Sequence, residues 1–266
     1  MDQHFCNTRE NKRKRHLLQL AIVVTTVLAI VLAFILIIDD ERNDKKMNIY
    51  RASSYKSEKE MNIQDVINMN GGKENLDKSE LDMTGIVRMG KEDAYLRYKE
   101  KKTVYELSGT LGEDIINSEE DAFCGLMRMK TIFRIPDDAI FYIKSVKNRP
   151  DDSTVYRFVQ VFGNAEVEGY MFTIGVAPDG KISFLSGKYN ESLSDTFSTD
   201  PALSEKEVIK RNKLKASPGD FELVITNKGR DNNCLAWRFH SSPLGRYLYY
   251  STDSGELINE QDIKQE

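Results

Sequence analysis

The strongest constraint on this chain is a run of 22 uncharged residues at positions 17–38 (LLQLAIVVTTVLAIVLAFILII). As a helix rising about 1.5 Å per residue, this run is roughly 33 Å long, which matches a hydrocarbon core about 30 Å thick. A helix buried in a soluble fold seldom has apolar residues on every face over such a length. The sequence therefore predicts one transmembrane helix at residues 17–38.

The charges that flank this run indicate its orientation. Five bases lie before it at residues 9–15, and three acids follow it at residues 39–41. Because Lys and Arg stay on the cytoplasmic side, we expect a cytoplasmic basic tail at 1–16 and extracytoplasmic domains from residue 39 onward. A cleaved signal peptide is the alternative, but its apolar region usually covers only about 7–15 residues and ends at a small-x-small site. We therefore expect an uncleaved signal anchor and a single-pass membrane protein that contacts lipid through residues 17–38.

The charge balance of the outer part argues against nucleic acid as a partner. Beyond residue 38 the chain has 33 bases and 40 acids, whereas a nucleic-acid interface needs clustered Lys and Arg. The outer cysteines, Cys124 and Cys234, could pair in an oxidising compartment or remain two thiols of the core. The sequence leaves that choice open.

The pattern of residues beyond the apolar run predicts a polar stalk followed by helices and strands. Residues 39–85 are rich in Lys, Glu, Asn and Asp, so we expect a loosely packed stalk with at most one short helix. Ser118 is followed by three acids and then by a one-sided apolar stripe, which predicts a helix that ends at Pro136. Ser204 begins a second helix in the same way. Strands are expected at 103–108, 140–146, 154–162, 170–176, 181–187, 221–226, 234–240, 246–251 and 256–259.

This order of elements predicts an α+β fold. Helix, meander, helix, meander is the order of two antiparallel-sheet-plus-helix units and not of a parallel sheet. We place the first unit at residues 86–200 and the second at 201–266. Asp179-Gly180 lies between two predicted strands of the first unit, where glycine suits the tight turn of a hairpin.

Motifs within these two units resemble a known family of secreted precursors. Phe158-Val159-Gln160, Val167-Glu168-Gly169-Tyr170, Asp179-Gly180 and Ser186-Gly187-Lys188-Tyr189 are similar in order to the fungalysin/thermolysin propeptide (FTP) motif. The stretch from Leu203-Ser204 through Leu235-Ala236-Trp237-Arg238 to Ser254-Gly255-Glu256-Leu257 resembles a PepSY domain. The family usually has an Asp-Ala pair before the last turn, where this chain has Ser251-Thr252.

The resemblance implies a cystatin-like fold for each unit and a propeptide-like function. In the family such propeptides precede a thermolysin-type metallopeptidase, which they inhibit and help to fold. Only eight residues follow Ile258, so we expect a propeptide-like module of the bacterial cell envelope without the peptidase domain. The motif positions make Gln160, Glu168 and Tyr170 the candidate partner contacts.

The residues of the outer part do not predict catalysis. A zinc peptidase needs two His one helical turn apart and a general-base Glu, but His240 is the single histidine beyond residue 38. No Gly-x-Ser-x-Gly elbow, phosphate-binding loop or dinucleotide fingerprint occurs. We therefore expect a protein that is not an enzyme and has no catalytic residues, metal site or cofactor.

Two functions fit this sequence. The first is a membrane-anchored extracytoplasmic module that binds a secreted or cell-surface peptidase in trans, as an inhibitor or as a folding chaperone. The second is a structural or sensory ectodomain of a cell-envelope protein. The sequence gives no indication of the oligomeric state.

Overall fold

A computed structural model of the chain describes residues 48–55, 60–72, 85–91, 93–99, 103–194, 196–217, 219–227 and 232–263. The predicted tail at 1–16 and the predicted transmembrane helix at 17–38 lie outside these residues. Among the helices that the structure describes, none is both long enough and apolar enough to cross a membrane.

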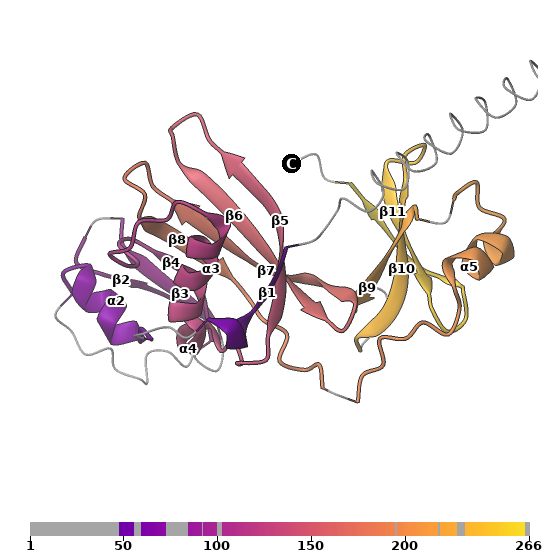
Figure 1. Cartoon of the computed structure of the whole chain (residues 1–266), viewed down its shortest axis with the longest axis horizontal. Coiled ribbons are helices and arrows are strands. Elements are labelled where there is room, and N and C mark those ends of the chain that lie inside the picture. Colours follow the sequence, from indigo (N-terminus) through magenta and orange to yellow (C-terminus); the bar gives the residue numbers. More distant parts are fainter. Residues whose placement is uncertain are drawn as a thin grey trace, which may run out of the picture. The chain divides into compact units, whose positions relative to one another are not determined.

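The described residues form a mixed α+β structure with a large sheet and few helices (Figure 1). The helical elements are η1 (Ala52–Ser54), α2 (Ile63–Met69), α3 (Glu119–Arg128), α4 (Lys130–Phe133) and α5 (Glu205–Asn212). The strands are β1 (Ile49–Arg51), β2 (Gly85–Arg88), β3 (Tyr95–Lys99), β4 (Thr103–Ser108), β5 (Ile140–Asn148), β6 (Thr154–Phe162), β7 (Ala165–Val176), β8 (Ile182–Gly187), β9 (Phe221–Thr226), β10 (Cys234–Ser241), β11 (Arg246–Ser251) and β12 (Leu257–Asp262). Each strand predicted from residue 103 onward is confirmed to within a few residues.

One continuous sheet replaces the two separate sheets that the sequence predicts. β7 pairs with β6 along one edge and with β8 along the other, and both pairings are antiparallel. The edge that pairs with β8 also pairs with β9, in a parallel ladder of two residue pairs: Glu166 with Val224, and Val167 with Ile225. The strands β9 to β12 then continue as an antiparallel meander. This single parallel pairing joins the first half of the sheet, β1 to β8, to the second half, β9 to β12.

A bulge in β7 allows the strand to take part in both halves. In the ladder with β6, Val159 lies opposite Met171 and Val161 lies opposite Glu166. The single residue Gln160 therefore faces four residues of β7, 167–170. Within the bulge Gly169 has φ of 78°, which a residue with a side chain rarely adopts. The strand thereby changes its partner from β9 to β8 along its length.

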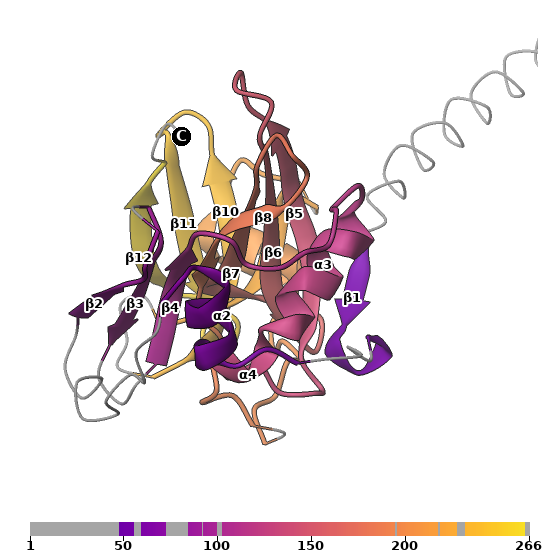
Figure 2. The ribbon, with the colours of Figure 1, turned by 90° about the vertical axis from the view of Figure 1, so that its left-hand side faces the viewer.

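The first half of the sheet has an aromatic core beneath α3. The Ser118 hydroxyl accepts a hydrogen bond from the Asp121 N–H and caps this helix, as predicted. Phe123 on the buried side of α3 is fully inaccessible to solvent, and its ring packs against the rings of Tyr50, Phe141 and Phe158. Figure 2 looks onto this face of the sheet, with α2, α3 and α4 in front of the strands. Burial of one Phe side chain contributes about 1.5–3 kcal/mol, so this cluster is a main source of stability.

Part of the predicted stalk belongs to this core. β1 adds to the edge of β5, and Val66 of α2 is completely buried. Asn70, at the end of α2, donates to the Thr110 carbonyl and accepts from the Thr110 N–H. The polar composition of residues 39–85 hides this packing, because a few apolar residues at helical spacing are enough to bury one side of a short helix.

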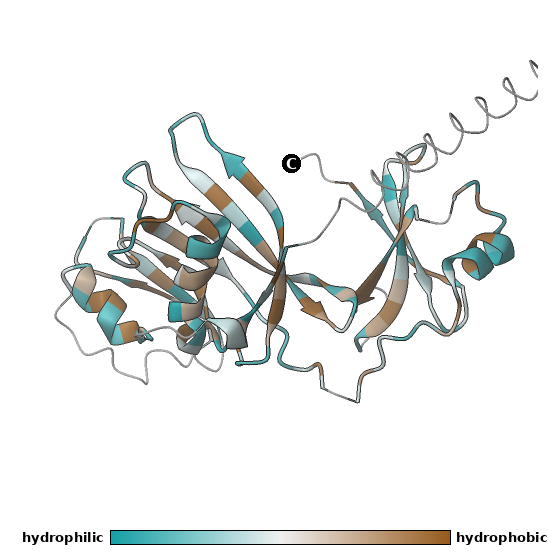
Figure 3. Cartoon of the chain, viewed as in Figure 1, coloured by the Kyte–Doolittle hydropathy of each residue, from teal (hydrophilic) through white to brown (hydrophobic). Residues whose placement is uncertain are grey.

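The second half has its own smaller core beneath α5. Val208 of α5 is buried against Phe221, Trp237 and Leu248 of the sheet. The Trp237 indole N–H donates to the Leu203 carbonyl at 2.8 Å, which fastens the segment before α5 to β10. Figure 3 shows hydrophobic and hydrophilic residues alternating along the strands, as expected for a sheet whose two faces meet different surroundings. Cys124 and Cys234 do not form a disulfide in this structure, which decides the choice left open above.

Candidate functional site

The face of the sheet opposite α3 carries no helix among the described residues, and it is the candidate binding surface. Phe172 and Ile174 of β7 are buried beneath the helices, so Met171 and Thr173 lie on the opposite face. A pocket of about 610 Å³ opens there, which we call the sheet groove. Much of its lining consists of hydroxyl-bearing side chains, glycines and lysines, namely Thr103, Tyr105, Thr173, Ser186, Gly169, Gly187, Lys99 and Lys188. The lining also includes one carboxylate, Glu106, which accepts a hydrogen bond from Tyr95 and lies 3.6 Å from Arg97. The two lysines therefore leave positive charge for a polypeptide partner.

Two lysines of the sheet groove lie over tyrosine rings. Lys99 Nζ is 5.3 Å from the ring centroid of Tyr105, and Lys188 Nζ is 4.5 Å from that of Tyr170. Each such contact stabilises an exposed cation by about 0.5–1 kcal/mol. Within the described part of the chain, neither ammonium group has a carboxylate at ion-pair distance. Both charges are therefore positioned by rings and remain open to an acidic group of a partner.

A buried charge network lies beside the sheet groove, where the two halves of the sheet meet. We call it the junction. At its centre is Arg238 of β10, whose side chain is 8% exposed. Its guanidinium group contacts Glu222 of β9 at 2.5 Å, Glu166 of β7 at 3.3 Å and Glu168 of the β7 bulge at 3.4 Å. One arginine of the second half thus binds two carboxylates of the first.

Hydroxyl and ammonium donors complete the junction. Tyr142 of β5 donates to Glu166, and Tyr249 of β11 donates to Glu168. Lys144 Nζ lies 3.0 Å from Glu166. The carboxylates of β7 therefore bind donors from both halves of the sheet, which fixes the two halves against each other through side chains as well as through the short β7–β9 ladder.

The pKa values at the junction follow from burial and from these partners. Burial alone raises the pKa of Glu166, but Arg238 and Lys144 outweigh it, and the pKa falls below the ordinary value. The pKa of Tyr142 is raised by burial and then by the Glu166 charge. Burial and Glu168 likewise raise the pKa of Tyr249. At neutral pH Glu166 is thus a charged acceptor, and Tyr142 and Tyr249 are neutral donors, as a stable structural network requires.

A second pocket, of about 490 Å³, lies at the junction itself. Arg238, Tyr247 and Tyr249 line it from the second half, and Glu166 and Glu168 line it from the first. It shares Gly169 and Met171 with the sheet groove. The helix-free face thus presents two adjoining hollows, one on either side of the β7 bulge.

The three predicted contact residues lie in different surroundings. Glu168 belongs to the junction. Tyr170 is half-buried, packs against the cluster that contains Val167 and Ile225, and has Lys188 over its ring. Gln160 is fully buried: its side-chain oxygen accepts from the Asn190 N–H at 2.8 Å, and its amide N–H donates to the Asn190 carbonyl at 3.3 Å. In this structure Gln160 acts within the fold. Contact of the three residues with a partner stays a prediction.

The two hydrogen bonds between Gln160 and Asn190, which we call the Gln160 brace, bring together two segments of the FTP-like motif. Gln160 lies on β6 and Asn190 follows β8. Their two hydrogen bonds therefore connect the Phe-x-Gln segment to the Ser-Gly-x-Tyr segment. Asn190 also begins an Asn-x-Ser glycosylation pattern, but only 4% of its surface is exposed. Its buried amide is therefore not accessible to a glycosylating enzyme in the folded protein.

The described residues offer no group of three or more His, Cys, Asp or Glu side chains that could hold a metal ion. His240 lies on the same face as the junction, with its ring 5.4 Å from that of Tyr247. The absence of an enzymatic activity stays a prediction. The sequence analysis missed the roles of Arg238 and Glu166, although a charged residue inside the apolar segment 234–239 (CLAWRF) was a signal for a buried ion pair.

Comparison with known proteins relates the chain to part of a peptidase. No protein-family model matches it. It is 22% identical over 180 residues to bacillolysin of Brevibacillus brevis, a peptidase of the thermolysin type. This match covers 60% of the chain and 33% of bacillolysin, so the chain spans about a third of the length of this relative. Among solved structures, the C-terminal domain of Bacillus megaterium YpeB matches with a TM-score of 0.40 and 13% identity, over 78% of this chain and 100% of that domain. The chain thus has weak, partial sequence similarity to a thermolysin-type peptidase.

Proposed function

We propose that this protein is a membrane-anchored, propeptide-like module that binds a peptidase in trans and inhibits it or assists its folding. The observation that carries the proposal is the helix-free face, where the sheet groove adjoins a preorganised junction. Docking by shape and charge needs a surface of this kind, held rigid before the partner arrives. The similarity to part of bacillolysin and the FTP-like and PepSY-like motifs support a peptidase of the thermolysin type as the partner.

The proposal includes the location of the protein. Residues 17–38 anchor the chain in the membrane, the basic tail at 1–16 is cytoplasmic, and the described residues lie outside the cytoplasm. This orientation brings the sheet groove into the compartment that secreted peptidases enter. A tag at the C-terminus should be cleaved by external protease in spheroplasts, while a tag at the N-terminus should be protected. The reverse pattern would contradict the location.

A binding experiment tests the proposed function. The full chain, purified in detergent, is immobilised and exposed to a thermolysin-type peptidase, and both binding and the residual cleavage of a chromogenic peptide are measured. The double variant Lys99→Glu/Lys188→Glu reverses the two open charges of the sheet groove. Lys206→Glu, on the exposed side of α5, makes the same kind of charge change away from it.

Three results can be distinguished. The proposal predicts saturable binding, a change in peptidase activity or refolding yield, and loss of binding in the Lys99/Lys188 double variant but not in Lys206→Glu. Equal binding by the wild type, the double variant and Lys206→Glu would show that the peptidase contacts a surface other than the sheet groove. The absence of any retained peptidase would contradict the proposed function and favour a structural or sensory ectodomain.

A further inference from the structure

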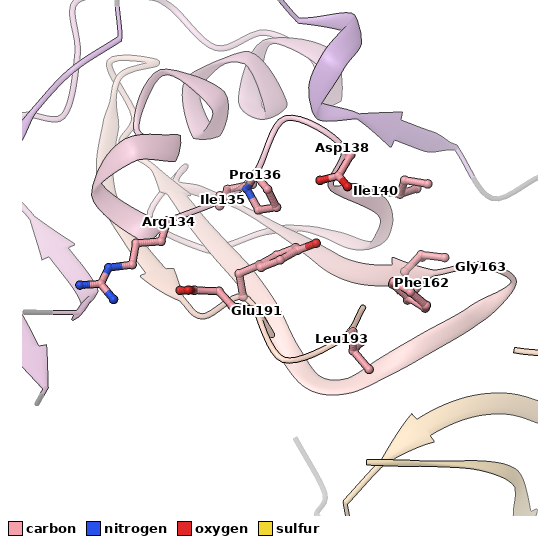
Figure 4. Close-up of a pocket in the computed structure, with 11 residues that line it drawn as sticks. Arg134, Ile135, Pro136, Asp138, Ile140, Phe162, Gly163, Glu191 and Leu193 are labelled. Atoms are coloured by element: carbon pink, nitrogen blue, oxygen red, sulfur yellow. The ribbon is translucent and has the colours of Figure 1, made fainter. Parts of the chain in front are cut away.

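A third pocket lies between the loop that follows α4 and the segment after β8. Its volume is about 690 Å³, and we call it the loop pocket (Figure 4). Its floor is apolar and is formed by Ile135, Ile140, Val161, Phe162 and Leu193. Exposed polar residues surround this floor, so the pocket combines a hydrophobic base with a charged rim.

The wall of the loop pocket is held in place before any ligand binds. Tyr189 and Glu191 line the pocket. Between them lies Asn190, whose backbone N–H and C=O both form hydrogen bonds with the side chain of Gln160. Asn190 in turn accepts hydrogen bonds from the Ser192 N–H at 3.0 Å and from the Ser192 hydroxyl at 2.6 Å. These bonds fix residues 189–192 in one conformation, which reduces the entropy lost when a ligand binds.

The charges at the rim of the loop pocket favour a cation at one end. Figure 4 shows Glu191 turned towards the Arg134 end of the pocket, with Asp138 at the other end. The pKa of the Tyr189 hydroxyl is raised to about 12, mainly by burial and then by the negative charge of Asp138. A hydrogen bond with the Gln160 side chain lowers this pKa in part. Asp138 has no ion-pair partner among the described residues. Glu191 likewise has no ion-pair partner among the described residues, but the charge of Asp138 acts more strongly than that of Glu191 on the Tyr189 hydroxyl, so the cation is expected at the Asp138 end.

We propose that the loop pocket binds a lysine side chain of a partner polypeptide, with the methylene stem on the apolar floor and the ammonium group at Asp138. The four methylene groups of lysine match an apolar base, and its three N–H donors suit the carboxylate together with a neighbouring phenol oxygen. An acidic side chain would be repelled by the Asp138 carboxylate, and a wholly apolar side chain would form no ion pair with it. Tyr189 is the one lining residue that the loop pocket shares with the sheet groove, whereas Asp138 and the apolar floor line the loop pocket alone.

The test uses a short peptide of known sequence as the probe. The full chain in detergent, labelled with ¹³C at Ile, Leu and Val methyl groups, is titrated with a capped pentapeptide that has one central lysine among alanines. Ile135, Ile140, Val161 and Leu193 provide reporters on the pocket floor. A second peptide with norleucine at the centre has the same aliphatic stem without the charge.

We expect the lysine peptide to shift these four sets of methyl signals and to bind about fivefold more tightly than the norleucine peptide, since a partly exposed ion pair contributes up to about that factor. Asp138→Asn should remove most of this preference. Glu191→Gln is the matched control at the Arg134 end and should change the affinity less than about twofold. Both residues are exposed, so the methyl spectra of the variants should otherwise be unchanged.

Several outcomes would overturn the proposal. These are equal affinity for lysine and norleucine, unchanged lysine affinity in Asp138→Asn, a larger effect of Glu191→Gln than of Asp138→Asn, and signal shifts confined to methyl groups outside the pocket. None of them bears on binding of a peptidase at the sheet groove, so this test and the binding experiment above can fail separately.

Discussion

The core beneath α3 and the junction are both buried, but they are built from opposite kinds of residue. The core is a cluster of aromatic rings around Phe123, which needs only shape and apolar area. The junction is a set of charges around Arg238, each of which requires a partner at the correct distance. A buried ion pair contributes little net stability compared with an apolar replacement, but the loss of one partner is costly. The core therefore supplies stability, whereas the junction fixes one arrangement of the two halves.

The largest expected effect tests the core. Phe123→Ala removes a fully buried ring and leaves a cavity among Tyr50, Phe141 and Phe158, which should lower the free energy of unfolding by about 3–5 kcal/mol. Urea unfolding followed by circular dichroism measures this change. Phe239→Ala, at a half-buried position in the second half, is the matched control and should cost less. A loss below about 1 kcal/mol for Phe123→Ala would contradict the assignment of the core.

Removal of the central charge of the junction should have the next largest effect. Arg238→Met removes the cation that binds both Glu166 and Glu168 at these buried positions and leaves Glu166 with Lys144 alone as its cation, so we expect a loss of about 3 kcal/mol. Trp237, the single tryptophan of the chain, lies next to this residue and reports on the second half through its fluorescence. Arg246→Met is the control, because its ion pairs with Glu260 and Asp262 are exposed to solvent and should contribute little to stability. Equal losses of unfolding free energy in Arg238→Met and Arg246→Met would contradict the claim that the junction charges matter more for stability than exposed ion pairs.

The Gln160 brace should rank below the junction, because its partners are uncharged. Gln160→Leu keeps the side chain apolar and similar in size but leaves the backbone N–H and C=O of Asn190 without their side-chain partner. The expected loss is about 1–3 kcal/mol. Amide hydrogen exchange should show faster exchange at residues 189–192, with β9 to β12 unaffected. Faster exchange across the second half as well would indicate that the brace also supports the junction.

The junction should also make stability depend on acid pH, and the aromatic core should not. The pKa of Glu166 is lower in the folded protein than the ordinary value of 4.5, so its stabilisation is complete above that value. It is lost as the pH falls through the lowered folded pKa, because protonation of Glu166 ends its attraction to Arg238. In Arg238→Met this acid-dependent loss should be smaller. Free energies of unfolding measured between about pH 3 and pH 7 test this, and identical pH profiles for wild type and variant would contradict it.

The sequence predicted local structure well, because local rules determine it. Serine cap signals at Ser118 and Ser204 located α3 and α5, and alternation with turn residues located the meanders from β5 to β12. Cap and turn chemistry acts over a few residues, so it can be read from a single sequence. Residues 63–69 show the limit of this reasoning: their polar surroundings predicted a stalk, but Val66 is buried through contacts with distant parts of the chain.

The long-range features of the candidate site could not be predicted in this way. The β7–β9 ladder and the junction depend on how a bulge at Gly169 redirects one strand, and no pattern in the sequence encodes the residue that meets Arg238. Gln160 was singled out because a polar residue lay among apolar ones, but the same signal fits a partner contact and an internal brace. Burial separates these two interpretations, and burial follows from tertiary structure.

The most direct test of this account is a double-mutant cycle between the two halves. Arg238→Met, Glu166→Leu and the double variant are compared with wild type in urea unfolding of the full chain, followed by Trp237 fluorescence. If the junction fixes the halves through this charge pair, the double variant should be more stable than the sum of the single effects predicts, with a coupling of about 1–3 kcal/mol. Additive losses, within about 0.5 kcal/mol, would contradict a network that joins the two halves of the sheet.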